Sequence, residues 1–86
     1  MRRPNRRPAL STRDLTVLEI ERRWGPSPSC LDLKLEEAWD RLRLDARAYA
    51  MVLNSLMEDP VAAAADRRTI ERLRAQRDQR RADRGL

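Results

Sequence analysis

The sequence predicts an all-α protein, a small domain of four to five helices with a helix-turn-helix-like pair and a basic arm at each end. Apolar residues recur at spacings of three and four, and β-branched residues never alternate with polar ones over a strand length. Phe is absent and Gly occurs only at Gly25 and Gly85, so the core must use Leu, Val, Ile, Met and Ala. With 86 residues, the chain forms one domain at most.

Charge is distributed unevenly along the chain. Of the 19 basic residues all but Lys34 are Arg, and the formal net charge is +5. This preference for Arg has two explanations, a GC-rich genome or selection for planar contacts to phosphates and bases. Residues 1–13 carry +5, residues 14–65 carry −4 and residues 66–86 carry +4. An acidic centre is therefore flanked by two basic ends.

The charge and proline patterns divide the chain into three parts. Residues 1–10 contain Arg-Arg-Pro twice, and because Pro4 and Pro8 discourage helix while the arginines repel one another, we expect a flexible, extended arm. Residues 11–74 form the helical domain, and residues 75–86 form a basic tail that is helical or frayed.

The first helix is expected at about residues 12–24. Ser11 is a good cap with Asp14 three residues later, and Leu10 and Leu15 occupy the positions of a hydrophobic staple. The run Gly25-Pro26-Ser27-Pro28 then ends the helix.

Two further helices follow. The second starts between Ser29 and Asp32 and runs to about Leu42, and Asp45 caps the third. The expected inward positions of the second helix are Leu31, Leu35, Ala38, Trp39 and Leu42, and those of the third are Ala46, Tyr49, Ala50, Leu53, Leu56 and Met57. We expect Trp24, Trp39, Tyr49 and Leu53 to be mutually buried in one core.

The carboxyl-terminal region predicts two more helical segments. Asp59-Pro60 is a cap followed by a first-turn proline, which opens a short Ala-rich helix over residues 61–65. Asp66 caps a last helix that has apolar contacts at Ile70 and Leu73 and nothing to bury after them. We expect its distal half to project from the body or to fray.

Residues 35–53 have the spacing of a helix-turn-helix, with a turn at residues 43–45. Arg43 stands where Gly is usual, and Trp39 stands where a small residue is usual, so a plain structural hairpin is the alternative. The exposed face of the third helix would present Arg47, Ala48, Met51, Asn54 and Ser55. Arg47 could pair with guanine and Asn54 with adenine. The alternatives are an intramolecular ion pair for Arg47 and a helix-ending hydrogen bond for Asn54.

Several short motifs occur in a fixed order along residues 11–81. They are Leu18-x-x-Glu21-x-x-Trp24, Tyr49-x-x-x-Leu53-Asn54-x-Leu56, Asp59-Pro60-x-Ala62 and Arg72-Leu73-Arg74. Together they resemble a family of short, functionally uncharacterised proteins of actinobacteria and their phages. The resemblance implies a helix-turn-helix-like core followed by an Arg-rich tail. The family favours two consecutive tyrosines where this chain has Ala48-Tyr49, so the contact to a base or to the nucleic-acid backbone that the resemblance implies for an aromatic at position 48 is missing here.

We expect a small cytoplasmic regulatory protein that binds nucleic acid, with DNA favoured over RNA. The arms should supply most of the phosphate contacts. The residues expected to contact nucleic acid are Arg2, Arg3, Arg6, Arg7, Arg43, Arg47, Met51, Asn54, Arg74, Arg77, Arg80 and Arg81. The alternative is an adaptor that binds transcription machinery or another host protein, because the acidic centre repels phosphate. The oligomeric state is left open between a monomer and a homodimer, since proteins that read operators usually act in pairs.

Other classes of protein lack the residues they need. The chain has no His and one Cys, Cys30, so neither an internal disulfide nor an ordinary zinc site can form. Without a neutral-pH base, a glycine-rich phosphate loop or an activated serine, we expect no enzyme, no catalytic residue, no metal and no cofactor. No apolar run approaches the roughly 18 residues of a membrane span, and no signal peptide is recognisable.

Overall fold

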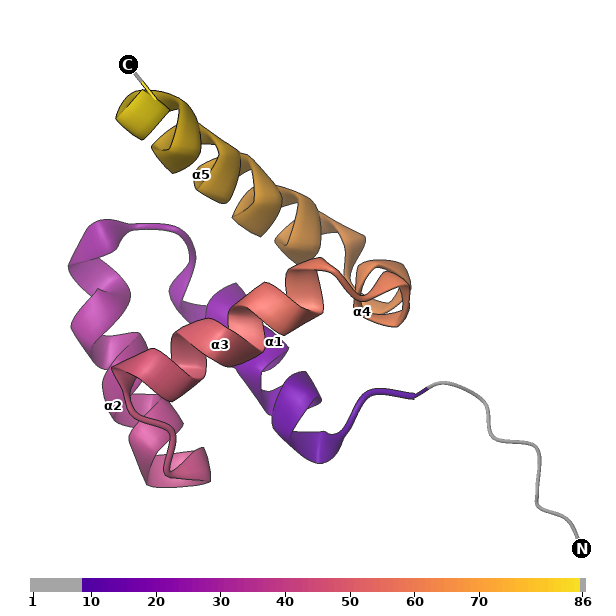
Figure 1. Cartoon of the computed structure of the whole chain (residues 1–86). Coiled ribbons are helices and arrows are strands. Elements are labelled where there is room, and N and C mark those ends of the chain that lie inside the picture. Colours follow the sequence, from indigo (N-terminus) through magenta and orange to yellow (C-terminus); the bar gives the residue numbers. More distant parts are fainter. Residues whose placement is uncertain (1–8, 86) are drawn as a thin grey trace, which may run out of the picture.

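The computed structural model describes residues 9–85 as five α-helices and one short 3₁₀ turn, with no strand in that range. This confirms the predicted all-α class. The elements are α1 (Thr12–Trp24), η1 (Pro28–Cys30), α2 (Leu31–Leu42), α3 (Ala46–Met57), α4 (Pro60–Ala65) and α5 (Arg67–Gly85). In Figure 1, α1, α2 and α3 form the body, α4 reverses the chain, and α5 runs across one side with its far end projecting.

The helices begin at the residues that the sequence predicts. Four predicted caps accept a hydrogen bond from a backbone N–H two or three residues further on, at 2.8 to 3.3 Å. Each one satisfies a donor that the first helical turn leaves without a partner. The capping side chains are those of Ser11, Asp45, Asp59 and Asp66.

Helix α1 lies at the centre of the core, where it contacts α2, α3 and α5. Val17 and Ile20 of α1 are fully buried, as is Ile70 of α5. The other apolar residues of the core are Leu18, Ala38, Tyr49, Val52, Leu56, Met57, Ala62 and Leu73. Beyond Leu73, α5 has no buried residue within the described chain, which is why its far half extends away from the body.

The predicted burial of Trp39 is wrong. Trp39 is 49% exposed, Trp24 and Leu53 are only partly buried, and Tyr49 alone of the expected aromatic cluster lies in the core. Helix α2 packs mainly on α1, through Lys34 and Ala38, so an indole on the flank of that contact faces solvent. The proposed staple residue Leu15 is likewise 51% exposed. Helical spacing places a residue on one face of its helix, but the packing of the neighbouring helix decides how much of that face is buried.

The turn between α2 and α3 forces Arg43 into a left-handed backbone conformation, with φ at 57°. Its N–H donates to the Trp39 carbonyl at 2.9 Å, and the N–H of Leu44 donates to the Ala38 carbonyl at 3.3 Å. The Arg43 guanidinium lies over the Trp39 ring at 5.3 Å from its centre. The exposed indole therefore supports a cation at the start of α3.

We predict that substitutions of Leu56 and Trp39 differ strongly in their effect on the stability of the fold. Leu56→Ala should lower the free energy of unfolding by about 2–5 kcal/mol, because the side chain is 2% exposed and its removal leaves a cavity. Trp39→Ala should cost about 1 kcal/mol or less, since it removes one partly solvated contact with Arg43. Urea unfolding followed by circular dichroism measures both, and equal losses would contradict the packing described here.

Candidate nucleic-acid interface

Helix α3 presents a solvent-exposed face that carries positive charge and no negative charge. Arg47, Met51, Asn54 and Ser55 are all exposed, as the sequence predicts, while Ala48 is half-buried. No acidic residue occurs between Ala46 and Met57. The Asp45 carboxylate just before the helix accepts a bond from the Ala48 N–H at 2.8 Å. A helix with such a face is suited to approach a polyanion.

Most arginines of the body are bound within the molecule. Arg22 pairs with Asp66, and Arg23 and Arg41 both pair with Glu37, at 2.8 to 3.3 Å. Within residues 9–85, another set makes neither an ion pair nor a hydrogen bond to a protein group: Arg43, Arg47, Arg68, Arg80, Arg81 and Arg84. These guanidinium groups are available to an external anion.

The residues predicted to contact nucleic acid are of three kinds: exposed residues, residues bound within the molecule, and residues outside the described range. Arg43, Arg47, Met51 and Asn54 lie in or just before α3, and Arg80 and Arg81 are exposed on α5. Arg74 and Arg77 are half-buried and instead make bonds to other groups of the protein. Arg2, Arg3, Arg6 and Arg7 lie outside the described residues.

Arg74 and Arg77 secure the carboxyl end of α3. Arg74 donates to the Met57 carbonyl from Nε at 2.8 Å and from Nη2 at 2.6 Å. Arg77 pairs with Glu58 at 2.9 Å. These bonds occupy carbonyl and carboxylate groups at a helix end, where cations are stabilising. We assign both residues to the attachment of α5 rather than to the interface.

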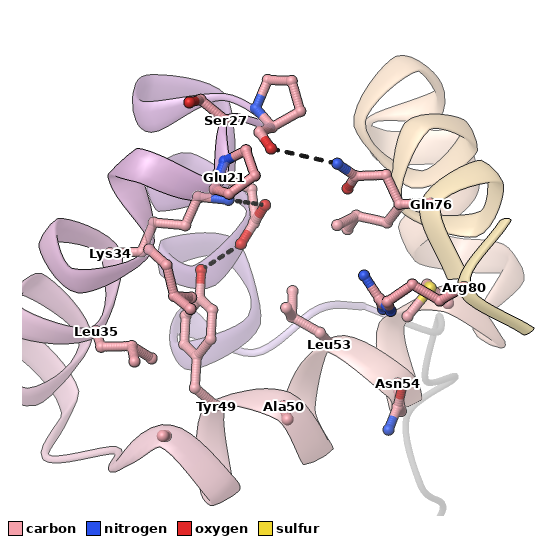
Figure 2. A pocket seen from close by; sticks show the side chains of 16 residues that line it. Glu21, Ser27, Lys34, Leu35, Tyr49, Ala50, Leu53, Asn54, Gln76 and Arg80 are labelled. Atoms are coloured by element: carbon pink, nitrogen blue, oxygen red, sulfur yellow. Dashed lines mark hydrogen bonds and ion pairs between the residues drawn. The ribbon is translucent and has the colours of Figure 1, made fainter. Parts of the chain in front are cut away.

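A groove of about 450 Å³ lies beside α3, between α2 and α5. Ala46 and Ala50, which the sequence places inward, are exposed and line this groove. Helix α2 packs on α1 while α5 packs on α4, α3 and α1, so the two outer helices diverge. Because the alanines between them are small, their side chains leave the space open. Figure 2 shows Lys34 and Leu35 on one side of this space and Gln76 and Arg80 on the other.

Four polar side chains meet at the inner end of the groove. Glu21, only 1% exposed, accepts bonds from Lys34 Nζ at 3.0 Å, from Arg72 Nη2 at 2.8 Å and from the Tyr49 hydroxyl at 2.7 Å. One carboxylate of α1 thereby joins α2, α3 and α5. Figure 2 shows the bonds from Lys34 and Tyr49 converging on Glu21.

Sequence reasoning missed this buried cluster, although a signal was present. Glu21 stands beside Ile20 on the buried side of α1, and Lys34 is the only lysine among 19 basic residues. An acidic residue on a buried helix face requires partners, because an isolated buried charge is costly. Removing one member of a buried ion pair typically costs about 3–5 kcal/mol, since the other charge stays buried alone.

The environment of Tyr49 disfavours its ionised form. Burial raises the pKa of the Tyr49 hydroxyl far above its ordinary value, and the hydrogen bond and negative charge of Glu21 raise it further. The neutral hydroxyl is therefore favoured, and it donates to Glu21 at 2.7 Å.

A second carboxylate joins α1 to α2 nearer the surface. Glu37 accepts from Trp24 Nε1 at 2.8 Å, from Arg23 at 3.0 Å and from Arg41 at 2.8 Å. The bond from Trp24 and the two guanidinium groups hold the pKa of Glu37 below its usual value. This cluster explains why Trp24 lies at the edge of the core, with its ring nitrogen directed to α2.

Among residues 9–85, no group of three or more Cys, Asp or Glu side chains is placed to hold a metal ion. No helix in that range has the length and apolar character needed to cross a bilayer.

We predict that Tyr49→Phe lowers the free energy of unfolding by roughly 1.5–3 kcal/mol, the usual contribution of a hydrogen bond to a charged group. The native protein should also lose stability above about pH 10, the ordinary tyrosine pKa. Since the raised pKa belongs to the folded state, the unfolded chain releases this proton first, and rising pH favours unfolding. The phenylalanine variant lacks this contribution, so the stability difference between the two proteins should shrink as pH increases. A constant difference, measured by urea unfolding from pH 7 to 11, would contradict this.

Comparison with known protein families identifies the family of this chain. It belongs to the family described as "Protein of unknown function (DUF3263)", which it matches over residues 9–85. Membership of an uncharacterised family is thus confirmed, whereas an origin in actinobacteria or their phages stays a prediction. No match was found among curated proteins or among solved structures.

Proposed function

We propose that this member of the DUF3263 family is a small regulatory protein that binds nucleic acid, with double-stranded DNA as its preferred partner. The observation that carries the proposal is the exposed face of α3. It holds Arg47 and Asn54 without an acidic residue, and it follows a turn at which Arg43 is also free of any ion pair within residues 9–85. The preceding helix α2 would hold α3 in place, as in a helix-turn-helix.

The dimensions of α3 suit the major groove. Its 12 residues span about 18 Å, and a groove about 12 Å wide admits one helix. Arg47 and Asn54 are two helical turns apart, about 10 Å, or about three base pairs of 3.4 Å. In this arrangement Arg47 would pair with guanine, and Asn54 would pair with adenine.

Phosphate contacts would surround this face. Arg43 is oriented by the Trp39 ring and precedes the first turn of α3. Arg80 and Arg81 are exposed on the part of α5 that projects. The amino-terminal arginines 2, 3, 6 and 7 would add sequence-independent contacts, which makes affinity depend steeply on salt. These arginines offset the acidic centre of the chain.

We predict that Arg47→Ala weakens binding to a preferred duplex by about 1–3 kcal/mol and changes binding to random DNA little, because a bidentate base contact is lost. Arg68→Ala is the matched control, since Arg68 is also exposed and free of ion pairs within residues 9–85 but lies on α5. Fluorescence anisotropy with both duplexes measures the effect. Equal losses on the two duplexes would make Arg47 a phosphate contact. No duplex binding by the unaltered chain, together with capture of a purified protein partner that nuclease does not affect, would overturn the proposal in favour of an adaptor.

We predict that Arg43→Gly separates stability from binding. Glycine relieves the left-handed backbone at φ 57°, so the free energy of unfolding should stay equal or rise by up to about 1 kcal/mol. Affinity for every duplex should fall, and the slope of log K against log salt should decrease by roughly 0.9, the value for one phosphate contact. Thermal unfolding and titrations at several salt concentrations provide the two readouts. An unchanged slope would remove Arg43 from the interface.

A further inference from the structure

The groove between α2 and α5 adjoins the face of α3 that is proposed to contact DNA, and its lining includes Asn54 and Arg80. Its volume of about 450 Å³ lies within the range of roughly 300–1,000 Å³ typical of small-molecule sites. Its walls are mainly apolar, and Leu31 at one end is 51% exposed although it lies on the same side of α2 as buried Ala38. The apolar lining residues that the inference uses are Leu31, Leu35, Ala50 and Leu53.

The charged groups of the groove are unbalanced. Glu21 is the one carboxylate in the lining, and both its oxygens already accept hydrogen bonds from Lys34, Arg72 and Tyr49. Two cations lie on opposite sides, Lys34 from α2 and Arg80 from α5 (Figure 2). The lining therefore carries a net positive charge.

Both cations have donors to spare. The Lys34 ammonium has three N–H donors, and within residues 9–85 it makes one hydrogen bond, to Glu21, although its side chain is only 10% exposed. Arg80 makes none in that part of the chain. A mostly buried ammonium with open donors, facing a free guanidinium across an apolar groove, calls for an anionic acceptor.

We propose that this groove binds an amphiphilic organic anion, such as an aliphatic carboxylate of medium length. The carboxylate lies between Lys34 and Arg80, and the hydrocarbon part packs on Leu31, Leu35 and Leu53. A cationic ligand is disfavoured because the Glu21 oxygens are already occupied. A neutral ligand would leave Arg80 without a counterion and would give the remaining donors of Lys34 no charged acceptor.

Calorimetric titration of the full chain with sodium decanoate, in the absence of nucleic acid, tests the inference. Decan-1-ol and decyltrimethylammonium serve as neutral and cationic probes with the same hydrocarbon length. We expect saturable binding of decanoate at one site, roughly tenfold tighter than decanol, as the loss of a charged hydrogen bond implies. No saturable binding, or equal affinity for the three probes, would overturn it. Because no nucleic acid is present, the result is independent of the DNA proposal.

Variants then locate the site. Arg80→Ala should weaken decanoate binding roughly tenfold, whereas Arg84→Ala, on the same exposed half of α5 but outside the groove, should leave it unchanged. Ala50→Leu should abolish binding by filling the groove, with little change in melting temperature because Ala50 is exposed. Lys34 is left unaltered, since its loss would strand Glu21 in the core. Equal effects of the two arginine variants, or undiminished binding to Ala50→Leu, would contradict the assignment.

Discussion

The carboxylate of Glu21 is the constraint on which the arrangement of the helices depends. It lies in the core of a domain too small to bury a charge without cost, and its compensation comes from three other helices at once. Apolar packing of Leu56 or Ile70 tolerates small shifts, but three hydrogen bonds to one carboxylate require α2, α3 and α5 to stand at defined positions around α1. The charged cluster thus supplies specificity of arrangement where a small core supplies limited stability.

The same pairing determines which charges remain for function. Glu19 and Glu37 each pair with both Arg23 and Arg41. Asp32, Glu36 and Asp40 of α2 make no ion pair within residues 9–85. The arginines that make neither an ion pair nor a hydrogen bond to a protein group within residues 9–85 lie at the α2–α3 turn, on α3 and on the far half of α5, apart from Arg68 near the start of α5. Part of the negative charge of the acidic centre is therefore balanced by ion pairs within the molecule, which leaves less of it to oppose the proposed contact with a polyanion.

Divergence of α2 and α5 has a second consequence beside the exposed face of α3. Small residues at positions 46 and 50 leave a groove where larger ones would have closed the bundle. The groove ends on the Glu21 cluster, so one buried carboxylate both orients the helices and holds the ammonium of Lys34 at the edge of this space. The proposed DNA contact and the proposed anion site use neighbouring sides of α3, with Asn54 at the boundary between them and Arg80 common to both.

Local interactions explain what the sequence by itself determined. Caps at Ser11, Asp45, Asp59 and Asp66 and the run at residues 25–28 act over a few residues, so the helix boundaries and the all-α class were predictable, as was the exposure of Arg47, Met51 and Asn54. Tertiary structure alone decided the rest. Trp39 and Ala50 lie on apolar stripes and are nevertheless exposed, because no helix covers those flanks. The bonds of Arg74 and Arg77 and the convergence on Glu21 depend on partners 13 to 51 residues away, a separation that local periodicity does not encode.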